Sequence, residues 1–219
     1  MEQMIVSQQI IAWMGTILLI SGFLTVLFRR FWNILACYRV QSFALAVAMW
    51  TTGRMIGNAH IEMIAYATVV VKVILIPAWI RHVLSRVATR TESRLTVGVA
   101  FSLFSAAGLL LLSHVVASRA LHGLKVAPED LTEVLALVLI GLFQMMTRRE
   151  AVTQMLGILF IENAVTLAAL TLAKGLPMII ELGIMFDVLI GILAMGILVY
   201  RIQEEFDTTD TAHLSTLQG

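Results

Sequence analysis

The chain has 219 residues, of which 59% are hydrophobic and only 13% are charged, and its mean hydropathy is +0.92. Soluble globular domains carry about 25% charged residues, so this composition excludes that class and predicts an integral membrane protein. The 15 basic and 14 acidic residues nearly cancel, to a net charge of +1, which excludes a basic surface for nucleic acid. Cys37 is the only cysteine, which excludes an internal disulfide, a Cys-ligated iron–sulfur cluster or a Cys-rich zinc site on this chain alone.

Seven hydrophobic segments are each close to the ~20 residues with which a helix crosses a bilayer. In chain order the predicted spans are Ile5–Phe28, Asn33–Thr52, Glu62–Ile80, Leu95–Ala117, Pro128–Met146, Ala151–Ala173 and Pro177–Ile202. The N-terminus has no basic region and no signal cleavage site, so we expect the first segment to be a retained span. The predicted fold class is an all-α integral membrane protein with about seven transmembrane helices.

Basic residues at the ends of the spans predict the orientation. Nine arginines follow the first, third, fifth and seventh spans, whereas the opposite side has only four basic residues: Arg54, Arg119, Lys125 and Lys174. Because cytoplasmic loops carry an excess of Lys and Arg, we expect the N-terminus outside and the C-terminus in the cytoplasm of a bacterial or archaeal inner (plasma) membrane.

Three regions are predicted along the chain. Residues 1–126 form a four-helix N-terminal membrane region, 127–203 a three-helix unit, and 204–219 a cytoplasmic tail. The order span, Arg-Arg loop, span, span occurs twice, with Arg29-Arg30 in the first set and Arg148-Arg149 in the second. This order gives the hypothesis that spans one to three and five to seven are a parallel duplication.

Lys72, Glu162 and Asp187 lie near the middle of predicted spans. A charge at that depth costs at least ~2.5–3.5 kcal/mol, so such residues usually face a partner or a water-lined path. These three are therefore candidates for moving protons or ions, although a static ion pair or a hydrogen bond that holds helices together would also account for them. Glu181, near the outer end of the last span, is either an entry group or a solvated first-turn acid. Pro77 should interrupt the helix that carries Lys72.

The sequence has few other candidates for chemistry. A haem would need two histidines at matching depth on different spans, and of the two on the outer side, His60 and His114, the first precedes its predicted helix. The sequence contains no metal-spaced cluster, phosphate-binding loop or nucleophile–base signature. We therefore expect no catalytic centre, cofactor or metal on this chain.

The last three predicted spans resemble the K subunit of respiratory complex I and the C subunit of multisubunit cation/proton antiporters. The resemblance is carried by Arg148-Arg149, Gly157, Asn163-Ala164 and Asp187-x-x-Ile190-Gly191. One position departs from that family, because its second-helix glutamate would fall at Leu159 and this chain has Glu162, one helical turn further along.

Nearly the whole chain resembles component E of hydrogenase-4, the membrane subunit of formate-hydrogenlyase-type complexes with a group 4 [NiFe] hydrogenase. The matching motifs are Gln41-Ser42, Lys72 to Pro77, Gly157, Glu162-Asn163, Glu181 to Ile184 with Asp187, and the ending Leu214 to Gly219.

This second resemblance implies a non-catalytic subunit that contributes Lys72, Glu162, Asp187 and Glu181 to proton translocation and helps to assemble the membrane arm. Antiporter-like and complex-I-like membrane subunits, with a hydrogenase or related redox arm, would be its partners, and those partners would hold the [NiFe] centre and the iron–sulfur clusters. Two alternatives remain open: a subunit of a multisubunit Na⁺/H⁺ antiporter without a redox arm, and a purely structural membrane linker.

Overall fold

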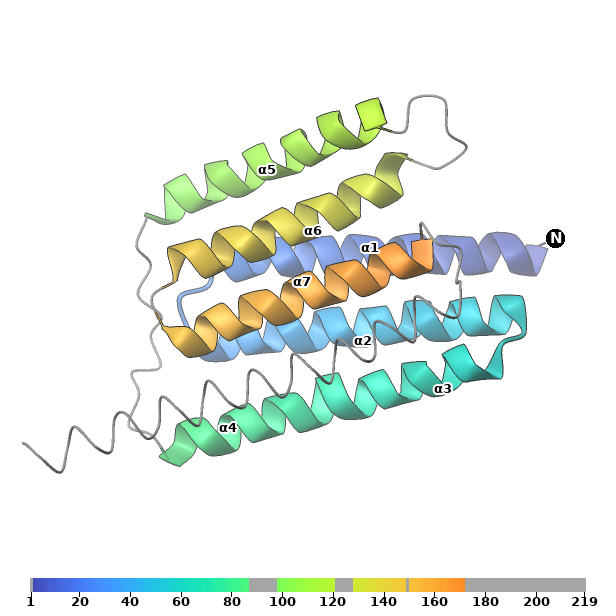
Figure 1. Ribbon diagram of the computed structural model, residues 1–219, viewed down its shortest axis with the longest axis horizontal. Helices are drawn as coiled ribbons and strands as arrows, with labels where there is room; N and C mark the ends of the chain where they lie inside the picture. Colours follow the sequence, from blue (N-terminus) through green and yellow to red (C-terminus); the bar gives the residue numbers. More distant parts are fainter. Residues whose placement is uncertain (1, 87–97, 121–127, 149, 172–219) are drawn as a thin grey trace, which may run out of the picture.

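The computed structural model describes residues 2–86, 98–120, 128–148 and 150–171, which are almost entirely helical. The elements are α1 (Glu2–Leu27), α2 (Phe31–Ile56), α3 (Ala59–Thr68), the π-helix η1 (Val69–Leu75), α4 (Ile76–Arg86), α5 (Val99–Ala120), α6 (Pro128–Thr147) and α7 (Ala151–Thr171). Figure 1 shows them as a bundle of roughly aligned helices. Within the described residues six segments are long and apolar enough to cross a membrane, and α3, η1 and α4 together supply one of them, Ala59–Arg81.

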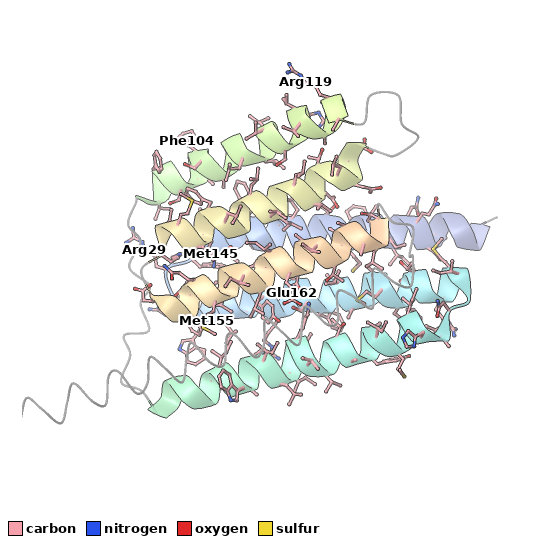
Figure 2. All side chains as sticks on the ribbon, viewed as in Figure 1. Arg29, Phe104, Arg119, Met145, Met155 and Glu162 are labelled. Carbon is pink, nitrogen blue, oxygen red and sulfur yellow. The ribbon has the colours of Figure 1, made fainter. Side chains whose placement is uncertain are left out.

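These six segments coincide with the first six predicted spans, with ends that differ by a few residues. The seventh predicted span, Pro177–Ile202, which carries Glu181 and Asp187, lies outside the described residues, as does the predicted tail. Arg29 and Arg119 lie at opposite ends of the bundle, as the alternation of loops requires (Figure 2). Which of these ends faces the cytoplasm stays a prediction.

Two hairpins form the centre of the bundle. The α1–α2 hairpin packs on the α6–α7 hairpin, with α1 against α6 and α2 against α7. On one flank α5 covers α6 and part of α1, and on the other flank α3 and η1 pack on α2 (Figure 1). The most deeply buried spans are consequently those of α2 and α7, whereas α5 is the most exposed. Side chains on α2 and α7 are therefore the best shielded from the surroundings of the bundle.

The distribution of side chains is that of a protein in lipid. Large apolar side chains face outward, for example Trp13, Phe104 and Met146, which are 68%, 78% and 82% exposed. The interior holds many small and polar residues, among them Ser42, Thr25 and Gln144. Lipid chains are as apolar as leucine, so outward-facing apolar side chains cost nothing there, and helices associate through close packing and hydrogen bonds. The chain is therefore a multi-pass membrane protein.

Gly141 and Gly157 allow α6 and α7 to approach closely. A β-carbon on Gly141 would lie 2.7 Å from Cγ1 of Ile161 and 3.2 Å from the carbonyl oxygen of Gly157. A β-carbon on Gly157 would lie 3.1 Å from the carbonyl oxygen of Gly141 and would also meet the side chain of Met145. Each glycine thus borders the backbone of the other helix, as small residues do where membrane helices cross. This crossing fixes the spacing between α6 and the central helix α7.

A tight turn joins α2 to α3. Gly57 ends α2 with φ of 65°, a left-handed conformation that glycine adopts without steric cost, and its N–H donates to the carbonyl oxygen of Gly53. Asn58 then caps α3, since its Oδ1 accepts a hydrogen bond of 3.0 Å from the N–H of His60. The short connection sends α3 and η1 back along α2.

Arg148, in the loop between α6 and α7, joins the two hairpins at one end of the bundle. Its side chain is buried, and Nη2 donates to the carbonyl oxygens of Thr25, at 2.9 Å, and Phe28, at 2.7 Å. Carbonyls at a helix C-terminus have no partner within the helix and carry partial negative charge, so a cation is a suitable cap for α1. Desolvation lowers the pKa of Arg148 to about 10, against the opposing effect of Glu150, and the guanidinium remains charged at neutral pH.

We predict that Gly157→Ala destabilises the bundle, because the added methyl group forces α6 and α7 apart. The expected cost is about 1–3 kcal/mol, as for other overpacked interfaces, and it should lower the thermal unfolding temperature of the detergent-solubilised protein. Gly108→Ala in α5 is the matched control, since a β-carbon at this position would meet no atom within 4 Å beyond its chain neighbours and the backbone of its own helix. The control should keep or raise the unfolding temperature, because alanine favours helix over glycine. Equal effects of the two changes would contradict the close crossing.

Candidate functional site

A buried ion pair lies in the middle of the bundle. Nζ of Lys72, on η1, is 2.7 Å from Oε1 of Glu162, on α7, and the two side chains are only 2% and 4% exposed. Both residues lie close to the middle of their spans, Ala59–Arg81 and Thr153–Thr171. Two residues that are 90 positions apart in the sequence are thus brought into contact at mid-depth, between a flanking helix and a central one.

The π-helix η1 directs Lys72 into the bundle. Val70, Val71, Ile74 and Leu75 are exposed, and Lys72 is the buried residue of this element. The sequence predicts an interruption at Pro77, and the structure places it just before that residue, over the seven residues Val69–Leu75. The N–H of Ile76 donates to the carbonyl oxygen of Val71, five residues earlier. Such π-helical turns are rare and are frequently found at functional sites.

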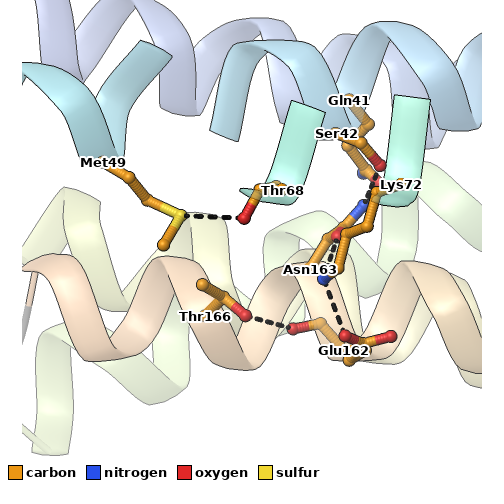
Figure 3. A network of polar contacts seen from close by, with 8 residues as sticks. All are labelled: Gln41, Ser42, Met49, Thr68, Lys72, Glu162, Asn163 and Thr166. Carbon is orange, nitrogen blue, oxygen red and sulfur yellow. Dashed lines mark hydrogen bonds and ion pairs between the residues drawn. The ribbon is translucent and has the colours of Figure 1, made fainter. Parts of the chain in front are cut away.

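Asn163 connects the ion pair to α2. Its Oδ1 accepts a hydrogen bond of 3.1 Å from Nζ of Lys72, and its Nδ2 donates at 3.2 Å to both Oε1 of Gln41 and Oγ of Ser42 (Figure 3). Gln41 in turn donates from Nε2 to the carbonyl oxygen of Leu18 on α1, at 3.1 Å. The mid-depth network therefore runs from η1 through α7 and α2 to α1, and its polar residues are all buried.

The chemistry of this network follows from its burial. Charges removed from water are costly unless they are paired and hydrogen-bonded, and the contact at 2.7 Å together with Asn163 satisfies both requirements for Lys72. Transfer of a proton from Nζ of Lys72 to Oε1 of Glu162 would convert the ion pair into two neutral groups. Two ionisable groups in such close contact titrate as a coupled pair.

A second carboxyl group lies on the opposite flank. Glu133 of α6 places its carboxylate against the Cα of Gly15 on α1, where any side chain would collide with it. Oγ1 of Thr16 donates to Oε1 of Glu133 at 3.4 Å. We did not predict a role for Glu133 from the sequence, since it lies only five residues into its helix and resembles an ordinary acid near a helix start.

The structure brings together some of the residues that the sequence analysis selected. Lys72 and Glu162 are in contact, and Gln41, Ser42 and Asn163, which were chosen only for the family resemblance, complete their network. Glu181 and Asp187 lie outside the described residues. The histidines considered as a haem pair are not brought together: His60 is on α3, which packs on α2, and His114 is on α5, across the bundle (Figure 1).

Comparisons with known proteins show a family to which the sequence belongs. Neither a family model nor a solved structure matches the chain. It is 30% identical over 183 residues to the uncharacterized protein Rv0085 of Mycobacterium tuberculosis, a match that covers 81% of this chain and 82% of that protein. The chain therefore belongs to the same family as Rv0085.

A more distant relationship links the chain to hydrogenase-4 component E of Escherichia coli K12. The two are 26% identical over 186 residues, which is 83% of this chain and 85% of that component. Hydrogenase-4 component E of Shigella flexneri matches to the same extent. These matches extend over nearly the full length, so the resemblance noted in the sequence holds at the level of a distant family relationship.

We predict that single changes in the ion pair destabilise the protein more than the double change. Lys72→Met or Glu162→Leu leaves the other charge buried without its partner, at a cost of about 3–5 kcal/mol, whereas removing both charges is nearly neutral. The unfolding temperatures of the detergent-solubilised single and double variants measure the coupling. Glu129→Gln, which changes an exposed carboxylate in the first turn of α6, is the control. Losses that simply add in the double variant would show that the two charges do not interact.

Proposed function

We propose that this chain is a non-catalytic membrane subunit of a hydrogenase-4-type complex and that its mid-depth charged residues take part in proton translocation. The observation that carries the proposal is the buried pair of Lys72 and Glu162. An intramembrane pair of this kind marks proton relays and ion pathways in membrane proteins. The distant relationship to hydrogenase-4 component E supports the choice of complex.

The proton step uses the two groups that already touch. In the resting ion pair the proton is on Nζ of Lys72. Its transfer to Oε1 of Glu162 leaves a neutral amine and a neutral carboxylic acid, a state that low-dielectric surroundings favour over two separated charges. When a rearrangement moves the partners apart, the carboxylic acid can pass its proton onward and Lys72 can take another. The direction of transfer then depends on which side has access to each group.

Asn163 and its contacts hold the pair in position. The amide accepts from Lys72 with Oδ1, and its Nδ2 is fixed by Gln41 and Ser42, so the side chain cannot turn without breaking bonds to α2. Lys72 is thereby kept within reach of Glu162 in its charged state. Positioning of a donor and an acceptor at hydrogen-bond distance is a condition for fast proton transfer.

The partners belong to the proposal as well. Antiporter-like and complex-I-like membrane subunits would continue the path on either side, and a hydrogenase or related redox arm would drive the rearrangement. The [NiFe] centre and iron–sulfur clusters would reside on those partner chains. Asp187 and Glu181 would extend the path beyond the described residues, and a cytoplasmic C-terminus in a bacterial or archaeal inner membrane completes the proposed arrangement.

Purification of the chain through a C-terminal tag from gently solubilised membranes tests the assembly. Mass spectrometry of stoichiometric partners should identify hydrogenase and antiporter-like subunits. Antiporter-type subunits without a redox arm would instead favour an ion exchanger, and a chain that purifies alone would contradict both assemblies.

We predict that Glu162→Gln abolishes proton uptake by membrane vesicles that contain the assembled complex, because glutamine has the shape of glutamic acid but cannot release a proton. Uptake is followed with a fluorescent pH probe after addition of the electron donor, and assembly is checked by co-purification of the partners. Glu129→Gln should leave uptake unchanged. Normal uptake by an assembled Glu162→Gln complex would mean that the ion pair only holds the helices together.

A further inference from the structure

The carboxylate of Glu133 packs against Gly15 and Thr16 of α1. The absence of a side chain on Gly15 lets the Glu133 carboxylate rest directly on the backbone of α1, where an added methyl group would overlap Oε2. Thr16, the next residue of α1, supplies a hydroxyl donor at 3.4 Å. Glu133 is only partly exposed. Gly15 and Thr16 of α1 thus form a contact site for the Glu133 carboxylate of α6, and we call this contact site the seat.

The depth of the Glu133 carboxylate in the membrane follows from the α1 residues that it contacts, and not from the position of Glu133 along α6. The span of α1 covers Val6–Leu27, so Gly15 and Thr16 lie at its middle. The carbonyl of Leu18, to which Gln41 donates, is two residues from Thr16 and hence only ~3 Å away along the helix axis. The Glu133 carboxylate therefore lies close to the level of the Lys72–Glu162 network, although its own Cα is five residues from the start of α6.

Glu133 has no cationic partner among the described residues. On its own helix the nearby titratable groups are Asp130 and Glu129, both acids. The part of α1 that faces it offers Thr16, and the titratable groups of the second half of α5, His114 and Arg119, are exposed. An isolated carboxylate anion at this depth is costly, and the residues that the structure describes supply no cation beside Glu133 to offset that cost.

Thr16 fits both protonation states of this group. Its hydroxyl has two acceptors within reach, Oε1 of Glu133 at 3.4 Å and the carbonyl oxygen of Ala12 at 3.1 Å, but it has only one proton to donate. It can donate to the carboxylate when Glu133 is ionised. When Glu133 is protonated, Thr16 can turn to Ala12 and accept from the new O–H group. The seat therefore accommodates loss and gain of a proton without unsatisfied donors.

We propose that Glu133 is a second proton-exchange carboxyl group. It lies on the flank of the bundle where α1 packs on α6, close to the level of the Lys72–Glu162 network. This flank lies across α1 and α2 from η1, so the two carboxyls, Glu133 and Glu162, stand on opposite sides of the Gln41–Leu18 contact. The role in translocation rests on the proposed function above. The proton exchange itself rests on the seat formed by Gly15 and Thr16.

Labelling with dicyclohexylcarbodiimide tests the proton exchange directly, because this apolar reagent enters the membrane and reacts with protonated carboxyl groups. In native membranes we expect peptide mass spectrometry to find Glu133 modified, with a yield that falls about tenfold per pH unit once the group ionises. A water-soluble carbodiimide should instead modify the exposed Glu129. Glu133→Gln should remove the first label, and Gly15→Ala, which displaces the carboxylate, should change its pH dependence.

A Glu133 that reacts only with the water-soluble reagent, or with neither, would overturn the inference, because the group would then be a solvated acid or a permanently ionised one. Proton uptake by assembled vesicles supplies the second criterion. Loss of uptake in Glu133→Gln supports the role, and unchanged uptake overturns it. If Glu133→Gln loses uptake while Glu162→Gln keeps it, the ion-pair function fails and the Glu133 inference stands; the reverse result has the opposite meaning.

Discussion

The ammonium group of Lys72 sets the main constraint on this bundle, because it is buried at mid-depth and must be neutralised there. Glu162 supplies the opposite charge and Asn163 supplies a hydrogen-bond acceptor, both from α7. Asn163 is itself fixed by Gln41 and Ser42 of α2. The two most buried spans are therefore registered against each other by polar contacts, and η1 is registered against both. In lipid, where apolar burial does not drive helices together, such contacts carry much of the specificity.

Close packing provides the frame in which those contacts form. The glycine crossing holds α6 beside α7, and the Gly57 turn returns the chain so that η1 lies along α2. Arg148 ties the end of α1 to the loop before α7. Each of these features acts on the backbone, and together they set the distances over which Lys72, Asn163 and Glu162 meet. The mid-depth network thus depends on the packing of the helix backbones around it.

Much of this arrangement follows from the sequence, but not all of it. Hydropathy predicts the six spans that the structure describes, since lipid imposes both their length and their composition. Lys72 and Glu162 stand out because ionisable residues are rare at mid-span. Asn163, Gln41 and Ser42 are uncharged, and no pattern says which helices face one another, so their common network emerges only in three dimensions. Glu133 was missed for a related reason: its depth depends on the helix that it touches, and not on its distance from the start of its own.

The hydrogen bonds from Arg148 to the end of α1, here called the latch, have a consequence for how sequences in this family can diverge. Because Nη2 contacts main-chain oxygens of Thr25 and Phe28, the side chain at position 28 is not part of the latch and can be replaced freely as far as this contact is concerned. Insertion or deletion of one residue in α1 would be different, since each residue turns the helix by about 100° and advances it by about 1.5 Å. Evolution at this end of α1 should therefore tolerate changes of residue type while conserving the number of residues.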